Sequence, residues 1–461
     1  MENDKKFNDT IFAGVARTDI SPGRGVQLAG DFGKRRPAEV VIQPLYSRIL
    51  VIKSEKKVLC LITMELAVIS RHAGDEMRSR IAGRYGFQIE DIMVHPLQIH
   101  AAPDLGHYMI MEETPFITPE LNWVRGGDDN YEKFAMDKTI EAVGQALANV
   151  QPVNVGWASA IEGRVAHNRR YVMRDGSVKM LPGRCNPEIL YVEGPVDPEV
   201  GVICFNTDQL HTIAMLLSYT CHPVHGYNFN YVTSGWPGAW ANSMSDMRGL
   251  ELGAIVVNGC CGNVYHDNHL DPDYKDDYIH MAAILKEASI KALKKLKYFD
   301  NNKLDSRSRI VKIPLRDIPE DVFTDAENYL QHYPTPEWTN KEMTQINWKW
   351  VHSLMLLERH KKYKIKNWEE YEIQVFRIGD MALVGLGGEP FVEAQLQIKM
   401  KSPVRATYFA HYANSFSPGY IPTKEAIERG GYETLLISAA YTPEALDMIV
   451  KATVEVLNEC F

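Results

Sequence analysis

The stretch FRIGDMALVGLGGEPF, residues 376–391, holds two apolar runs with a Gly-Asp pair between them and a pair of glycines before Glu389. Short apolar runs bounded by Gly and Asp are typical of strands that lie in a core. The stretch therefore predicts two core strands, and it places a carboxylate at the point where the second strand ends.

Similar apolar runs alternate with helical stretches through the first 265 residues, among them KVLCLITMEL (57–66), TIAMLLSYT (212–220) and AIVVNG (254–259). The clearest helices are expected at about 129–150, 276–297 and 442–458. This pattern predicts an α/β fold of mixed twisted sheets flanked by helices, with a single large core over residues 10–461. A stretch rich in Trp, Lys and Glu at 319–370 is expected to be a helical insertion within that core.

The composition is that of a folded protein and narrows the expected partners. Of the 461 residues, 45% are hydrophobic and 24% are charged, and the formal net charge is -9. Because no long block of Lys or Arg is present, nucleic acid is not an expected partner. No apolar run is long enough for a signal peptide or a membrane span, so we expect a cytoplasmic protein. A small-molecule substrate is the expected partner, and a homo-oligomer is compatible with these features.

Polar side chains crowd the ends of four apolar strands, where a rigid strand meets solvent. They are His95, Gln98, His100 and His107 after the run at 91–97, His222 and His225 after the run at 212–220, Glu389, and finally His411, Tyr412 and Tyr420. Imidazole and carboxylate ligands from separate strand ends suit a catalytic zinc ion, which keeps one position open for water. For any single histidine, a hydrogen-bonded structural position is the more common alternative.

Separated segments of the chain resemble the neutral ceramidase family, in the same order as in that family. These are GVARTDISPG (14–23), QPLYSRILVI (43–52), IHAAPDLGHY (99–108), HNRR (167–170), the stretch at 376–391 and YANSFSPGYIPTKEAIERGGYET (412–434). The resemblance covers nearly the whole chain and implies the catalytic domain of that family, as a divergent member. The C-terminal immunoglobulin-like domain of secreted ceramidases is not expected here.

The resemblance also implies a zinc site. Carried over residue by residue, three family ligands fall on His222, Glu389 and Tyr412, and the fourth, a His in the family, falls on Gln98. Since an uncharged amide is a weak ligand, Gln98 is expected to lower zinc affinity and leave metal occupancy in doubt. The neighbouring family His is retained as His100, which is expected to move protons.

The family's nucleophile and substrate-binding residues carry over unevenly. Its Ser loop reads NGCCGN at 258–263, where Cys261 is a candidate nucleophile but a packed Cys pair is the more common structure. Attack by metal-activated water is therefore favoured. Arg169 matches the family's substrate-binding Arg, against a surface salt bridge as the alternative. Tyr420 and Tyr432 match cavity tyrosines, against ordinary core tyrosines as the alternative.

These features favour a zinc-type hydrolase that cleaves an amide or related bond in a small polar substrate. Two alternatives stay open. One is a hydrolase or lyase for a glycoside or lactone, for which Trp236 and Trp240 are candidate platforms for a ring-shaped ligand, against ordinary core packing of Trp. The other is a non-catalytic binding protein that retains the fold.

Overall fold

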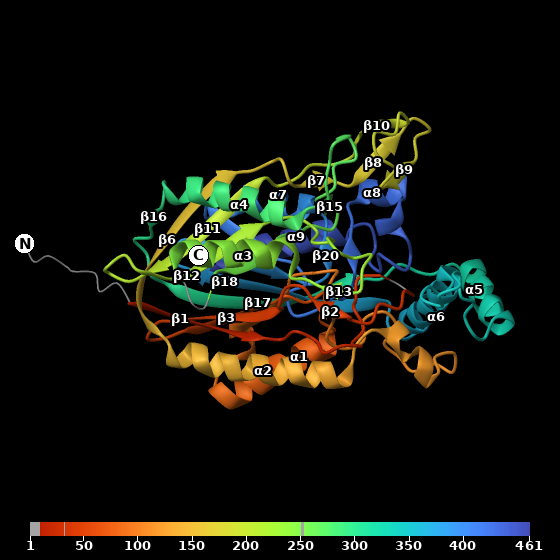
Figure 1. Ribbon diagram of the computed structural model, residues 1–461, viewed down its shortest axis with the longest axis horizontal. Coiled ribbons are helices and arrows are strands. Elements are labelled where there is room, and N and C mark those ends of the chain that lie inside the picture. The colour runs from red at the N-terminus through yellow and green to blue at the C-terminus, as the bar shows by residue number, and fades with distance from the viewer. Residues whose placement is uncertain (1–9, 32, 250–252) are drawn as a thin grey trace, which may run out of the picture.

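Two β-sheets pack face to face in the computed structural model, which describes residues 10–31, 33–249 and 253–461 (Figure 1). The large sheet runs in the order β14 (Ile255–Asn258), β12 (Thr212–Tyr219), β11 (Glu199–Asn206), β6 (Gln151–Ile161), β1 (Ile11–Asp19), β3 (Tyr46–Lys53), β4 (Val58–Met64) and β5 (Ile92–Pro96). The small sheet runs in the order β17 (Leu304–Pro314), β18 (Trp368–Ile378), β19 (Met381–Leu386) and β21 (Ala406–Ala410).

Helices cover the outer face of each sheet. The large sheet is covered by α1 (Arg71–Tyr85), α2 (Asp129–Ala148), α3 (Gly235–Arg248) and α4 (Tyr278–Leu293), and the small sheet by α7 (Val392–Lys401) and α9 (Ala445–Cys460). Shorter elements include β2 (Val40–Val41), β7 (His167–Asn168), β8 (Arg170–Met173), β9 (Val178–Met180), β10 (Ile189–Val192), β13 (Tyr231–Val232), β15 (Val264–Tyr265), β16 (Lys297–Tyr298), β20 (Glu389–Pro390), β22 (Tyr420–Ile421) and α8 (Lys424–Arg429). The predicted α/β fold with flanking helices is confirmed.

The apolar runs are continuous because each long strand is buried on both faces. In β3, Ile49 and Val51 pack under the helices, whereas Leu50 and Ile52 face the small sheet. In β19, Leu383 faces the large sheet and its neighbours pack under α7 and α9. Alternate residues of a strand point to opposite faces, so one apolar run supplies two layers of core.

The stretch predicted as a helical insertion contains α5 (Glu320–His332) and α6 (Trp348–Ile365), which pair at one end of the molecule (Figure 1). Strand β18 begins at Trp368, so the helical part ends before that residue. The α6 residues Trp350 and Val351 pack with Tyr108 and Met109, which joins the helix pair to the core loops. Across the residues that the structure describes, no helix is both long and apolar enough to cross a membrane.

Candidate active site

The polar strand ends meet at one edge of the two-sheet stack. Strand pairs β4-β5 and β12-β14 are parallel in the large sheet, and β19-β21 is parallel in the small sheet. Gln98 follows β5, His222 follows β12, Cys261 follows β14 and Tyr412 follows β21. Carboxyl ends of parallel strands are where open α/β sheets bind their ligands. Glu389 joins them from β20, which pairs with β22.

A cavity of about 140 Å³ is lined by Gln98, Glu389 and Tyr412. Its lining also includes His100, Tyr420 and Tyr432, and α6 supplies part of the wall through Met355, Glu358 and Arg359. At the density of liquid water this volume holds about five water molecules, which matches a small substrate or one end of a larger one.

Glu389 is the carboxylate at the bottom of this cavity, and it is 4% exposed. Its Oε1 accepts a hydrogen bond from the Tyr412 hydroxyl at 2.5 Å, and its Oε2 accepts one from Gln98 Nε2 at 2.7 Å. Burial raises the pKa of Glu389 to about 6, although the Tyr412 hydrogen bond and the Arg169 charge oppose this shift. The group therefore changes protonation near neutral pH.

His222 presents a lone pair to Glu389. Its Nδ1 lies 2.9 Å from the Cys261 carbonyl oxygen, and because a carbonyl accepts only, Nδ1 carries the proton. Nε2 is therefore a bare acceptor in the neutral ring, and it lies 3.4 Å from Glu389 Oε2, a second acceptor. Burial lowers the pKa of His222 well below its usual value, which keeps the ring neutral. Two acceptors in this position call for a proton or a cation between them.

The amide oxygen of Gln98 also faces another hydrogen-bond acceptor. His411 donates from Nδ1 to the Asn258 carbonyl at 3.0 Å, so its Nε2 is an acceptor, yet it lies 3.0 Å from Gln98 Oε1. Turning the amide by about 180° would let Gln98 Nε2 donate to His411. Oε1 would then face Glu389 and Tyr412. One orientation of the amide satisfies Glu389, and the other satisfies His411 and presents an oxygen ligand to a cation.

A buried ion-pair network lies behind Tyr420. The Arg169 guanidinium donates from Nη2 to the Tyr420 hydroxyl at 3.0 Å and from Nε to Glu433 Oε1 at 2.8 Å. The other Glu433 oxygen accepts from Arg170 Nη1 at 2.8 Å. Arg169 is 4% exposed and Glu433 is 0% exposed, so the charges are held rigidly away from water. Arg169 thus polarises the Tyr420 hydroxyl, which lines the cavity.

Two of the site residues have left-handed backbone conformations. Gln98 has φ 66° and Tyr412 has φ 53°. Such angles cost non-glycine residues of order 1–3 kcal/mol and occur preferentially at functional sites. Both positions correspond to the ligand set expected from the sequence.

Comparison with solved structures identifies the architecture. No family model matches the chain, and no curated protein matches it. The crystal structure of neutral ceramidase from Pseudomonas aeruginosa superposes with a TM-score of 0.73 at 18% identity, covering 98% of this chain and 74% of that one. The chain has the neutral ceramidase fold. A structure described as ceramidase complexed with C2 agrees, with a TM-score of 0.72 at 16% identity and coverage of 98% and 75%.

The resemblance inferred from separated segments is thereby confirmed for the fold. Within this neutral ceramidase fold, His222, Glu389, Tyr412 and Gln98 come together as the sequence predicted. The donor set fits a zinc-type ion, because His222 directs a bare nitrogen at the site while its other nitrogen donates to a backbone carbonyl, as zinc-ligating histidines do. Gln98 fits only with its amide oxygen turned inward.

Other sequence candidates lie elsewhere in the neutral ceramidase fold. His95 is structural, since it donates to the His411 carbonyl and accepts from Asn258 N. His107 binds the Gly126 carbonyl. The proposal of Trp236 and Trp240 as ligand platforms is wrong. Both side chains are 0% exposed in α3 and pack in the core, where burial of their apolar surface stabilises the fold.

One functional neighbour escaped the sequence reasoning. Glu433 fixes Arg169, and its sequence signal was its place inside the segment at 412–434 that resembles the family. His411, a candidate from its strand-end position, contacts Gln98 through Nε2. Cys261 donates to Gln98 Oε1 at 3.2 Å, and burial raises its thiol pKa well above the usual value, which opposes thiolate formation.

Proposed function

We propose that the chain is a metal-dependent hydrolase that cleaves an amide bond in a small polar substrate. The observation that carries this proposal is the pair of acceptor atoms, His222 Nε2 and Glu389 Oε2, held 3.4 Å apart, with Glu389 in the lining of a cavity. Two solved structures with this fold are ceramidases, and ceramide is an amide, which favours that bond. The small cavity volume favours a compact acyl group over two long chains.

The metal would be held by His222, Glu389 and Tyr412, with Gln98 Oε1 as a weaker fourth ligand. When bound, a zinc-type ion supplies Lewis acidity, which makes water a usable nucleophile near neutral pH. The acceptor conflict between His222 and Glu389 supports this assignment, since a cation removes it. The Gln98 amide must then turn, which also satisfies His411.

The chain's own residues then bind, polarise and move protons. The Tyr420 hydroxyl accepts a bond from Arg169 and is a hydrogen-bond donor to Glu389. When a substrate binds, that proton would turn to the oxyanion that forms on the scissile carbonyl. Arg169 acts through Tyr420, and the Tyr432 ring, 5.9 Å from that of Tyr420, packs beside the substrate. His100 lines the cavity, and burial lowers its pKa to about 3, so it is neutral at pH 7. So low a pKa makes His100 a weak base, so it would relay a proton only from a water made acidic by the metal and would pass it on to the leaving nitrogen.

A metal-free binding protein is a second candidate. It is favoured by the first amide orientation, in which Gln98 Nε2 fills the hydrogen-bonding capacity of Glu389 Oε2 without any cation. In that protein the cavity would bind a small polar molecule without turnover.

The test is amine release from a panel of short N-acyl amides, with simple glycosides and lactones alongside, in parent and Glu389→Gln protein. The exposed Glu428→Gln is the matched control. We expect amide turnover in the parent and the control and a loss of about 100-fold or more in Glu389→Gln, as is usual when an electrostatic catalytic group is removed. Turnover of a glycoside or lactone alone, or equal rates in all three proteins, would reject the amidase proposal.

Metal content separates the two candidates. We expect the parent to carry bound zinc-type metal and Gln98→His to bind it more tightly, with Gln88→His as an exposed control that leaves affinity unchanged. A metal-free parent that gains an ion only in Gln98→His would favour the binding protein.

A further inference from the structure

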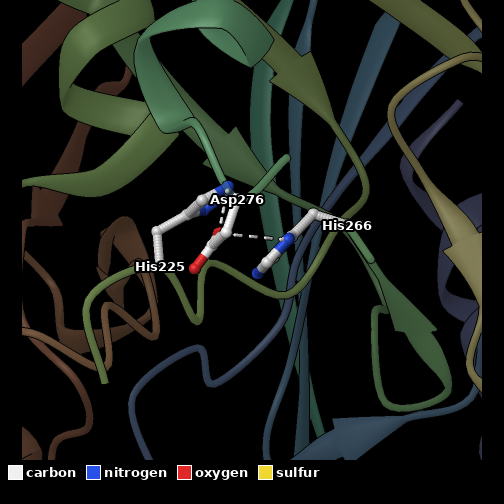
Figure 2. A group of neighbouring side chains, drawn as sticks. All are labelled: His225, His266 and Asp276. Atoms are coloured by element: carbon white, nitrogen blue, oxygen red, sulfur yellow. Dashed lines mark ion pairs between the residues drawn. The ribbon is translucent and has the colours of Figure 1, made fainter. Parts of the chain in front are cut away.

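A second group of metal-ligating side chains lies outside the site described above. His225 is in the loop after β12, His266 directly follows β15, and Asp276 precedes α4. One ligand atom from each lies within 4.8 Å of the others. Figure 2 shows the Asp276 carboxylate beside the two imidazoles, with a dashed contact to each.

The two histidines are poorly satisfied where they are. His225 is 2% and His266 is 5% exposed, and within the described residues His225 Nδ1 and His266 Nε2 have no hydrogen-bond partner. Asp276 Oδ1 lies 3.5 Å from His225 Nε2 and 3.8 Å from His266 Nδ1, distances too long for good hydrogen bonds. Buried polar atoms without partners are rare in native proteins, and a missing ion or water is a recognised cause.

We propose that His225, His266 and Asp276 form a second site for a divalent ion of the zinc type. Two imidazoles and one carboxylate are a ligand set that zinc favours, with an open position for water. Burial lowers the pKa of His225 to about 3 and that of His266 well below its usual value, so both rings are neutral, as ligands must be. The Tyr274 hydroxyl is hydrogen-bonded to His266 Nδ1 at 2.5 Å, and it would have to turn away or become a further oxygen ligand when an ion binds.

Binding requires a local rearrangement. The two rings are stacked, with centroids 3.7 Å apart and planes 18° from parallel, so their lone pairs do not converge. One ring must turn about its Cβ–Cγ bond, a torsion that is broad for histidine. Asp276 is half exposed and can follow the ion, because its carboxylate makes no tighter contact with the rings.

An ion bound at this site would cross-link two loops. His266 and Asp276 enclose the loop at 267–275, so an ion bound to both would close it, and the bond to His225 would tie it to the loop after β12 that also carries His222. This site does not depend on the proposed hydrolase chemistry. Its ion is held by different residues from those around Glu389.

The test is titration of metal-stripped protein with Co²⁺ and Zn²⁺, followed by calorimetry and by the visible absorption of Co²⁺. It is done in the Glu389→Gln background, so that the other site does not contribute. We expect about one equivalent to bind. Asp276→Asn and His266→Gln should each weaken binding by about 100-fold or more, at least as much as the loss of an outer-shell partner costs. Asp273→Asn, an exposed residue of the same loop, is the control.

Three results would overturn the proposal. The first is that Glu389→Gln protein binds no ion, and the second is that an ion binds equally to all the variants. The third is a parent that binds one equivalent and loses it in Glu389→Gln. Circular dichroism on each variant distinguishes loss of the site from loss of the fold.

Discussion

Glu433 is expected to be the residue whose charge matters most to the stability of the site. One of its oxygens pairs with Arg169 and the other with Arg170, both at 2.8 Å, and the exposed fractions of these three side chains are 0–4%. The isosteric change Glu433→Gln removes the negative charge without creating a cavity. It leaves two buried guanidiniums that repel each other.

The cost follows from what each arginine retains. Arg170 keeps its ion pair with Glu193, whereas Arg169 keeps a hydrogen bond to the neutral Tyr420 hydroxyl and the more distant charge of Glu389. Removing one partner of a buried ion pair typically costs 3–5 kcal/mol, because the other charge stays desolvated and unpaired. Since one of the two arginines remains compensated, we expect a loss of about 3 kcal/mol in the free energy of unfolding.

The assay is equilibrium denaturation in urea, read by circular dichroism and by tryptophan fluorescence. Glu428→Gln, an exposed change in the same segment, should stay within about 0.5 kcal/mol of the parent. Adding Arg169→Met to Glu433→Gln should recover part of the loss, because the unpaired charge is then gone. A cost below about 1 kcal/mol for Glu433→Gln, or no recovery in the double variant, would refute the reasoning.

Three further outcomes are expected. Burial raises the pKa of Glu389 to about 6, so ionisation of this group destabilises the folded, metal-free protein as the pH rises from about 4.5 to above 6. Glu389→Gln removes this cost. In urea titrations its free energy of unfolding should therefore rise by about 2 kcal/mol relative to that of the parent between these two pH values. Gly14→Ala should destabilise by about 1–3 kcal/mol in the same assay, because its Cβ would lie 2.2 Å from the Ala146 carbonyl oxygen, whereas Gly163→Ala has open space and should not. After brief iodoacetamide treatment of the native protein, mass spectrometry should find exposed Cys185 alkylated and buried Cys261 unmodified. If Cys261 were labelled and turnover were lost at the same rate, Cys261 would again be a candidate nucleophile.

Much of the fold could be read from apolar patterning. The run at 381–386 is a strand buried on both faces, and helices occur at 129–148 and 278–293, close to the expected positions. The last helix begins at Ala445, three residues after the expected start, and its N-terminus has no side-chain cap. A backbone hydrogen bond from Ala445 N to the Thr442 carbonyl closes the turn that precedes it.

Only part of the candidate site could be predicted from the sequence. Strand-end polarity and the family resemblance pointed to His222, Glu389 and Tyr412, because each follows an apolar strand. The orientation of Gln98, by contrast, depends on which nitrogen of His411 carries a proton, and that is fixed by a carbonyl 153 residues away in sequence, at Asn258. His225, His266 and Asp276 become neighbours only through the meeting of two loops. Pairings of this kind are set by tertiary structure and leave no local pattern.

The residues around Glu389 come from two distant parts of the chain. Gln98 and His222 follow strands of the large sheet, whereas Glu389 lies in β20 and Tyr412 follows β21, both in the last quarter of the chain. During synthesis, the first pair leaves the ribosome long before Glu389 and Tyr412. Under the proposed metal assignment, the full ligand set would therefore form only after the last strands have docked.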